Sequence, residues 1–195
     1  MHKRWMLSLF TLALPLAVTA QDAPPMSAEE QAMMEAYQKA GTPGPEHARL
    51  AASVGDYLLS IKTYQAPGAE PMHDVGKARR YMNLAGRVLV EEVDSAMMGQ
   101  SFAGYGMTGY DNVSGRYWST WNDSMTTGVM VSDGSCDASG ACEFSGTYND
   151  PITRQPLSSR MTSKPAGDGV EIFHMYGPGP DGKEMLMMEI TYTRQ

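Results

Sequence analysis

The chain has 195 residues, which is enough for one domain with a sizeable hydrophobic core. Its formal charge at neutral pH is −7, from 22 acidic and 15 basic side chains. An acidic surface repels phosphates and anionic lipid head groups, so the composition disfavours a nucleic-acid-binding protein and a protein of anionic membrane surfaces.

The first twenty residues have the pattern of a secretory signal peptide. Basic residues at positions 2–4 precede an apolar run over residues 5–18, and small residues follow up to Ala20. We expect cleavage after Ala20 and a periplasmic or secreted protein. A membrane anchor is the alternative. It is disfavoured because the run is shorter than the ~20 residues that span a bilayer and because Pro15 interrupts it.

Two short helices are predicted before any strand. Ser27 and Glu30 have the spacing of a capping box, so a helix begins at Ser27 and ends near Ala40, before a segment rich in Gly and Pro. This helix either rests on the domain or acts as a lid or partner-binding element. Pro45 then opens a second helix that ends near Ser53, in keeping with the preference of proline for the first turn.

The rest of the chain is almost entirely β-structure. Runs rich in β-branched and aromatic residues alternate with turns rich in Gly, Pro, Asn and Asp. The predicted strands cover residues 57–65, 72–84, 87–96, 102–110, 116–123, 129–136, 142–148, 157–163, 170–176 and 184–194. The sequence therefore predicts a signal peptide over residues 1–20, a linker with a helical extension over 21–44, and an all-β domain over 45–195.

Short connections between these strands exclude parallel pairing, which needs a crossover of a dozen or more residues. The prediction is a single antiparallel meander of about ten strands. Such a sheet avoids exposed edges by closing into a barrel, and a barrel of this size has room for one small ligand. An antiparallel sandwich is the alternative.

Cys136 and Cys142 flank a predicted hairpin turn over residues 137–141. In an oxidising compartment, two cysteines opposite each other on a hairpin are expected to form a structural disulfide. The alternatives are a redox pair and a metal site. They are disfavoured because there is neither C-x-x-C spacing nor a nearby histidine.

Several short motifs are spread along the predicted barrel. They are Glu46-His47 with Leu50, Gly86-Arg87 with Leu89-Val90-Glu91-Glu92, Gly109-Tyr110-Asp111-Asn112-Val113, Ser119-Thr120-Trp121, Asp123-Ser124-Met125, Thr127-Gly128, and Met188-Glu189-Ile190-Thr191-Tyr192-Thr193-Arg194. With these motifs in this order, the chain resembles the bacterial domain-of-unknown-function family 1579 over residues 45–194. That family is grouped with calycin-like barrels, so the resemblance implies a lipocalin-like cup. It implies no activity and no catalytic residue.

One residue departs from the calycin pattern. Many calycins carry Gly-x-Trp after their short helix, whereas this chain has Gly55-Asp56-Tyr57. An aromatic side chain at this place plugs the base of the barrel. Tyr57 is expected to do the same, but its hydroxyl needs a hydrogen-bond partner there.

Alternation along the strands sorts side chains onto two faces, although it does not say which face is the lumen. Arg87 and Glu91 share one face of their strand, and Trp121 and Asp123 share one face of theirs. In the last strand, Leu186, Met188, Ile190 and Tyr192 oppose Met187, Glu189, Thr191 and Thr193. A lumen that carries Arg87, Glu91, Trp121, Asp123 and Glu189 has an aromatic wall and a few polar groups, as ligand sites do. Alternatively, these charges pair with one another and brace the barrel.

The candidate ligand-binding residues are Arg87, Glu91, Tyr105, Trp121, Asp123, His174 and Glu189. We predict no catalytic residue, no cofactor and no metal site, since the histidines of the mature chain are widely spread. Seventeen methionines suit the lining of an adaptable apolar pocket. Gly104, Gly106 and Gly109 are expected to relieve crowding at a bend or to let another group approach closely.

Three functions are compatible with this pattern. The favoured one is the binding of a small, largely apolar ligand in the barrel. The second is an enzyme in which lumen carboxylates act on a small molecule, with Asp123 as general base beside Arg87. The third is a structural or partner-binding module with a filled barrel, which would show an exposed apolar patch. The sequence does not identify the ligand or the oligomeric state.

Overall fold

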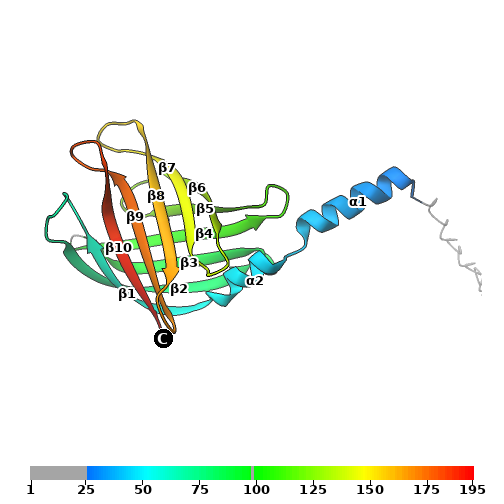
Figure 1. Ribbon diagram of the computed structural model, residues 1–195, viewed down its shortest axis with the longest axis horizontal. Coiled ribbons are helices and arrows are strands. Elements are labelled where there is room, and N and C mark those ends of the chain that lie inside the picture. The colour runs from blue at the N-terminus through cyan, green and yellow to red at the C-terminus, as the bar shows by residue number, and fades with distance from the viewer. Residues whose placement is uncertain (1–25, 98) are drawn as a thin grey trace, which may run out of the picture.

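The computed structural model describes residues 26–97 and 99–195. The predicted signal peptide lies outside these residues. The described chain forms ten antiparallel strands that close into a barrel, with two helices before them (Figure 1). The strands are β1 (Gly55–Thr63), β2 (Met72–Asn83), β3 (Val88–Met97), β4 (Gln100–Asp111), β5 (Arg116–Asp123), β6 (Met130–Cys136), β7 (Cys142–Asn149), β8 (Pro156–Pro165), β9 (Val170–Pro178) and β10 (Glu184–Arg194). The predicted all-β meander barrel is confirmed.

Each strand pairs with the next one along the chain, and β1 pairs with β10 to close the barrel. Tyr57 lies opposite Arg194 at the start of this closing pair, and Thr63 lies opposite Met188 at its end. Closure pairs both edges of the sheet, so no edge strand is left open to another chain. The predicted ranges 116–123 and 184–194 match β5 and β10, and the other strand ends differ by one to a few residues.

The first helix, α1 (Ala28–Gly41), has the predicted capping box. The Ser27 amide donates to Glu30 Oε2 at 2.7 Å, and the Glu30 amide donates to Ser27 Oγ at 3.2 Å. No residue of α1 is buried, and the helix projects away from the barrel (Figure 1). The expectation that it rests on the domain is therefore wrong. Its contact with the barrel is made by Asn112, whose amide group donates to carbonyl oxygens at the end of the helix.

The second helix, α2 (Pro45–Ala52), closes one end of the barrel. Its buried residues are His47 and Leu50, which share one face of this short helix. Leu50 packs against Leu89 and Tyr117, which face inward from β3 and β5. This contact covers the end of the barrel at which the β2–β3 and β4–β5 turns lie. Access to the interior is therefore from the opposite end.

Tyr57 occupies the base of the barrel, as expected. Its hydroxyl donates to the Ser53 carbonyl oxygen at 2.7 Å, which supplies the partner that burial requires. Beside it, the Arg194 guanidinium donates to the carbonyl oxygens of Ala52 and Val54, at 2.7 Å each. These contacts fasten the C-terminal end of α2 to the last strand.

The predicted disulfide between Cys136 and Cys142 is present. The two residues lie directly opposite each other, at the end of β6 and the start of β7. Among the described residues, no helix is long and apolar enough to cross a membrane.

Candidate functional site

The inward face of the barrel is identified by burial and register. In β1, Tyr57, Leu59 and Ile61 are 4%, 3% and 6% exposed, whereas the residues between them are more exposed. Residues that pair directly across strands face the same side of a sheet, so the strand registers carry this assignment around the barrel. On this basis, β1 to β4 form a packed wall with the buried residues Tyr57, Leu59, Ile61, Ala78, Val93 and Phe102.

The opposite wall carries a row of small side chains. Direct partners on neighbouring strands define this small-residue row, which consists of Thr108, Ser119, Ser132, Gly146 and Ser159. Ser119 and Ser132 join their hydroxyl groups in a hydrogen bond of 2.7 Å. Because these side chains are short, other side chains can lie over them, and Ser132 and Ser159 are 4% and 2% exposed.

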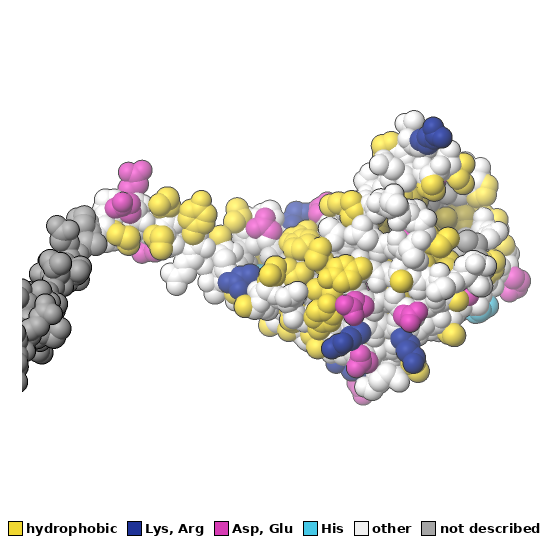
Figure 2. Space-filling view, turned by 180° about the vertical axis from the view of Figure 1, so that it is seen from behind, with side chains coloured by type: hydrophobic (Ala, Val, Ile, Leu, Met, Phe, Trp, Pro, Cys, Tyr) yellow, Lys and Arg dark blue, Asp and Glu magenta, His cyan; other side chains and the backbone are white. Residues whose placement is uncertain are grey.

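Large apolar side chains on β9 and β10 also face the axis of the barrel. Phe173, Met175, Met188 and Ile190 all remain partly exposed. In a barrel filled by its own side chains, residues at such positions are covered. Phe173, Met188 and Ile190 pack against residues of the packed wall and are only partly covered, so open space remains beside them. Figure 2 shows a hollow in the surface with hydrophobic side chains set back inside it.

Methionines supply much of the lining of this hollow. If Gly146 carried a Cβ atom, it would lie 3.0 Å from Met161 Cε and 3.2 Å from Met130 Cγ. These two side chains therefore lie over the small-residue row. A bulge in β10 between Leu186 and Met188 breaks the alternation and turns Leu186 outward, beside Tyr176. Met187 then points inward as well, because its Cγ lies 3.4 Å from the Cβ position of Gly177.

A charged cluster lies at the closed end of the interior. It consists of Arg80, Glu91, Glu171 and Tyr192. The Arg80 guanidinium pairs with the Glu91 carboxylate and donates to both oxygens of Glu171, at 2.8 Å and 3.3 Å. The Tyr192 hydroxyl donates to Glu91 at 3.2 Å, and the Arg80 guanidinium lies 4.4 Å from the centre of the Tyr192 ring.

Electrostatics keep the Arg80 guanidinium charged and the Tyr192 hydroxyl protonated. Burial of Arg80 disfavours its cation, but attraction to Glu91 and Glu171 outweighs burial and raises the pKa of the guanidinium well above its ordinary value. Burial, reinforced by the nearby Glu91 carboxylate, raises the pKa of Tyr192 well above its ordinary value, so its hydroxyl remains a donor. One guanidinium and two carboxylates leave a net negative charge. The predicted bracing by paired charges is present here, but it centres on Arg80, which the sequence analysis did not single out.

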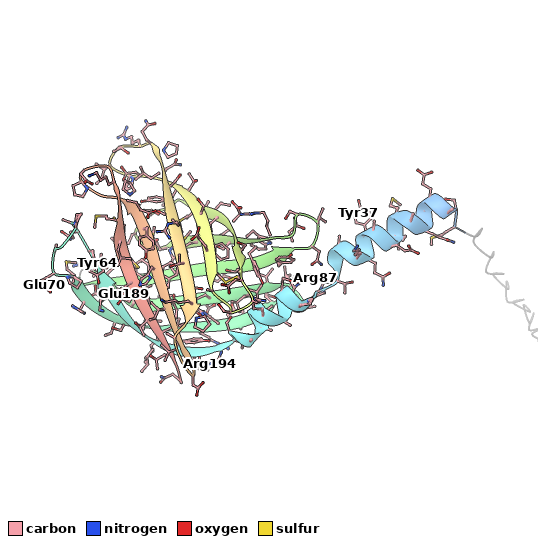
Figure 3. The ribbon with its side chains drawn as sticks, in the orientation of Figure 1. Tyr37, Tyr64, Glu70, Arg87, Glu189 and Arg194 are labelled. Atoms are coloured by element: carbon pink, nitrogen blue, oxygen red, sulfur yellow. A yellow bond between two sulfur atoms is a disulfide. The ribbon has the colours of Figure 1, made fainter. Side chains whose placement is uncertain are left out.

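Arg87 lies at the β2–β3 turn. Its guanidinium donates to the carbonyl oxygens of Leu84, at 3.2 Å, and Ala85, at 3.5 Å. Figure 3 shows Arg87 next to α2, far from Glu189. Asp123 ends β5 at the open end of the barrel, so the structure does not bring together the pair that the enzymatic hypothesis requires.

Trp121 and Asp123 face inward near the open end. The Trp121 indole donates to Asp123 Oδ2 at 3.1 Å. The ring lies flat over Gly104 and Gly106, and a Cβ atom at Gly104 would lie 2.4 Å from Trp121 Cζ2. Of the two roles considered for these glycines, close approach of another group is the one the structure shows.

The other predicted site residues face outward. Tyr105 is 41% exposed on the outer face of β4. Glu189 accepts hydrogen bonds from Lys62, at 2.8 Å, and lies 3.1 Å from His174 Nε2, all on the outer surface of β1, β9 and β10. Three of the seven candidates, Glu91, Trp121 and Asp123, therefore face the interior, and they do not form one contiguous cluster.

The outer pair of Lys62 and Glu189 predicts a pH-dependent contribution to stability. The hydrogen bond from Lys62 lowers the pKa of Glu189, so the folded state gains stability above the unfolded-state pKa of about 4.3 and loses it as the pH falls through the lower folded-state pKa. Replacing Glu189 with Gln should lower the melting temperature at pH 7 by about 2 °C. The difference from the wild-type chain should shrink at pH 3. Glu70→Gln, in the exposed loop after β1, is the control. An equal difference at both pH values would contradict the assignment.

Two open depressions lie on the outer face of β1 to β3, with volumes of about 450 Å³ and 590 Å³. Leu58, Lys77 and Asp94 contribute to both. Their linings mix apolar residues with charged ones. We take the interior, whose lining combines apolar side chains with a few polar ones, as the candidate site.

Comparison with known proteins places the chain in a family. No curated protein matched the sequence. The crystal structure of Rv2717c from M. tuberculosis has a similar fold, with a TM-score of 0.61 at 10% identity over 79% of this chain and 99% of that one. At this identity the similarity concerns the fold alone. The family profile described as "Protein of unknown function (DUF1579)" matches residues 42–194. The resemblance inferred from the motifs is thus confirmed, and the chain belongs to this family.

Proposed function

We propose that the chain is an exported protein that binds a small, largely apolar molecule inside its barrel. The observation that carries this proposal is the partial exposure of Phe173, Met175, Met188 and Ile190, which face the barrel axis. Apolar surface that faces a cavity and is not covered by the protein gains free energy when a ligand covers it. Export follows from the pattern of residues 1–20, and the disulfide is compatible with it.

Three features support the interior as the binding site. The hollow is closed at one end by α2 and open at the other, as a ligand-binding cup is. Its lining combines apolar side chains with a small number of polar ones, which is the usual composition of a small-molecule site. Its methionine side chains are unbranched and flexible, so the lining can adapt to ligands of different shape.

A bulky side chain that fills the interior should weaken ligand binding. Met175 faces inward and pairs with Met161, whereas the adjacent Tyr176 faces outward under the Arg160 guanidinium. Met175→Trp is expected to lower the affinity for diphenylhexatriene, a fluorescent hydrocarbon, at least about tenfold. Tyr176→Trp, the matched control on the outer face, should leave the affinity unchanged. Fluorescence titration measures both, and circular dichroism checks the fold. Equal affinities in the two variants, or no binding by the wild-type chain, would refute the proposal.

A further inference from the structure

Three buried side-chain oxygens lack a hydrogen-bond partner in the described part of the chain: Thr63 Oγ1, Tyr117 Oη and Ser159 Oγ. All three belong to residues at inward-facing positions of the barrel. A buried hydroxyl without a partner destabilises the fold, and natural proteins leave few of them. Tyr117 packs under α2 at the closed end, whereas Thr63 and Ser159 lie toward the open end, where a ligand would enter.

Ser159 is placed best to contact such a ligand. It is 2% exposed and lies in the small-residue row on β8, beside Gly146 on β7. On the β9 side, its Oγ lies 3.8 Å from the Cβ position of Gly177. The space beside these glycines holds methionine side chains, since a Cβ atom at Gly146 would lie 3.0 Å from Met161 Cε and 3.2 Å from Met130 Cγ. Met187 lies over it, since Met187 Cγ is 3.4 Å from the same Cβ position. A methionine side chain can change rotamer at little cost, so this cover is movable.

The charges in the interior select the kind of polar group that fits. Among the described residues, the charged side chains that face the interior between the two ends are Arg80, Asp74, Glu91, Glu171 and Asp123. The guanidinium of Arg80 pairs with the two glutamates of the charged cluster. An anionic head group would meet four carboxylates and one cation that is already paired. An uncharged head group meets no such repulsion and can pair with a hydroxyl.

We propose that Ser159 is the hydrogen-bonding point for an uncharged polar head group of the ligand, such as a hydroxyl, an ester or another carbonyl. The apolar part of the same molecule lies against Met175, Met188 and Ile190. This inference rests on the proposed function, because it names the class of molecule that the hollow takes. The class is a neutral amphiphile, as opposed to a fatty acid anion or a pure hydrocarbon.

The test uses the mature chain and two variants of adjacent residues. Ser159→Ala removes the inward hydroxyl, and Ser158→Ala removes an exposed outward one. Bound diphenylhexatriene is displaced by 1-decanol or by decanoate, and the two affinities are compared. The wild-type chain should bind 1-decanol more tightly than decanoate. Ser159→Ala should weaken binding of 1-decanol about fivefold more than it weakens binding of diphenylhexatriene. Ser158→Ala should alter neither.

Thermal unfolding provides a second readout. Because the Ser159 hydroxyl is buried without a partner, Ser159→Ala should raise the melting temperature by about 2 °C while it weakens decanol binding. A hydroxyl with a purely structural role would instead lower the melting temperature when removed. Unchanged decanol affinity in Ser159→Ala, or tighter binding of decanoate than of decanol, would overturn the inference and leave the proposed function intact. Failure of diphenylhexatriene to bind the wild-type chain would overturn both.

Discussion

Replacing Arg80 with methionine is expected to destabilise the barrel by about 3–5 kcal/mol. The Arg80 side chain is 8% exposed and pairs with Glu91 and Glu171, which are themselves mostly covered. Its removal leaves two carboxylates inside the barrel without a cation. It also removes the guanidinium from its positions over the rings of Tyr57 and Tyr192, at 5.0 Å and 4.4 Å from the ring centres.

Urea unfolding measures this effect, and two further variants interpret it. Arg79→Met removes the adjacent arginine, which faces outward over Tyr81, and should cost less than about 1 kcal/mol. Adding Glu91→Gln and Glu171→Gln to Arg80→Met should restore part of the lost stability, because the buried carboxylates are then absent. A loss below about 1 kcal/mol in Arg80→Met alone would show that the charged cluster does not brace the barrel.

Gly134→Ala is expected to cost about 3 kcal/mol or more. Gly134 faces inward on β6 between Tyr117 and Phe144. A Cβ atom there would lie 2.2 Å from the Glu143 carbonyl oxygen and 2.7 Å from Phe144 Cγ. The first of these contacts is with backbone, so the β6–β7 pair must separate to admit the methyl group. This pair carries the aromatic packing at the closed end, where Tyr117 and Phe144 meet with ring centres 6.3 Å apart.

The control for this prediction is Gly128→Ala, in the segment before β6. A Cβ atom at Gly128 would have its nearest neighbour, Thr126 Oγ1, at 3.9 Å. That variant should be as stable as the wild-type chain to within about 0.5 kcal/mol. If thermal unfolding finds the two variants equally stable, close packing at Gly134 is not what holds β6 against β7.

Much of the fold was predictable because its signals are local. Turn residues separate the strands, and the capping box of Ser27 and Glu30 marks the start of α1. The short hairpin between Cys136 and Cys142 places the two cysteines opposite each other. Short connections then leave an antiparallel meander as the way to pair ten strands. The position of α1 was not predictable in this way, since it depends on hydrogen bonds from Asn112, more than 70 residues away, to carbonyl oxygens at the end of the helix.

The candidate site was predictable only in part, because it depends on register. In β3, burial does not alternate along the strand. Val88, Leu89 and Val90 are all buried, although only Leu89 faces inward. The bulge in β10 shifts the alternation of inward and outward side chains, and no residue type in this strand indicates that a bulge is present. Glu189 consequently lies outside while Met187 lies inside.

The sequence also did not identify which arginine pairs with Glu91, and the reason is again register. Arg80 and Arg87 are both near Glu91 in sequence, and both lie on the inward side of their strands by alternation. Register decides between them, because Arg80 lies directly opposite Glu91 whereas Arg87 falls in the turn. Glu171 joins from a strand 91 residues further along, a contact that no local pattern contains. Long-range pairing of this kind follows from closure of the barrel.

The central claim is that the interior of the barrel binds a small apolar molecule. A crystal structure of residues 21–195 grown with diphenylhexatriene tests it most directly. The claim predicts density for the hydrocarbon inside the barrel, in contact with Met175, Met188 and Ile190, and no such density in Met175→Trp. Density confined to the outer face around Leu58 and Lys77, or a barrel interior occupied by the protein's own side chains, would contradict it.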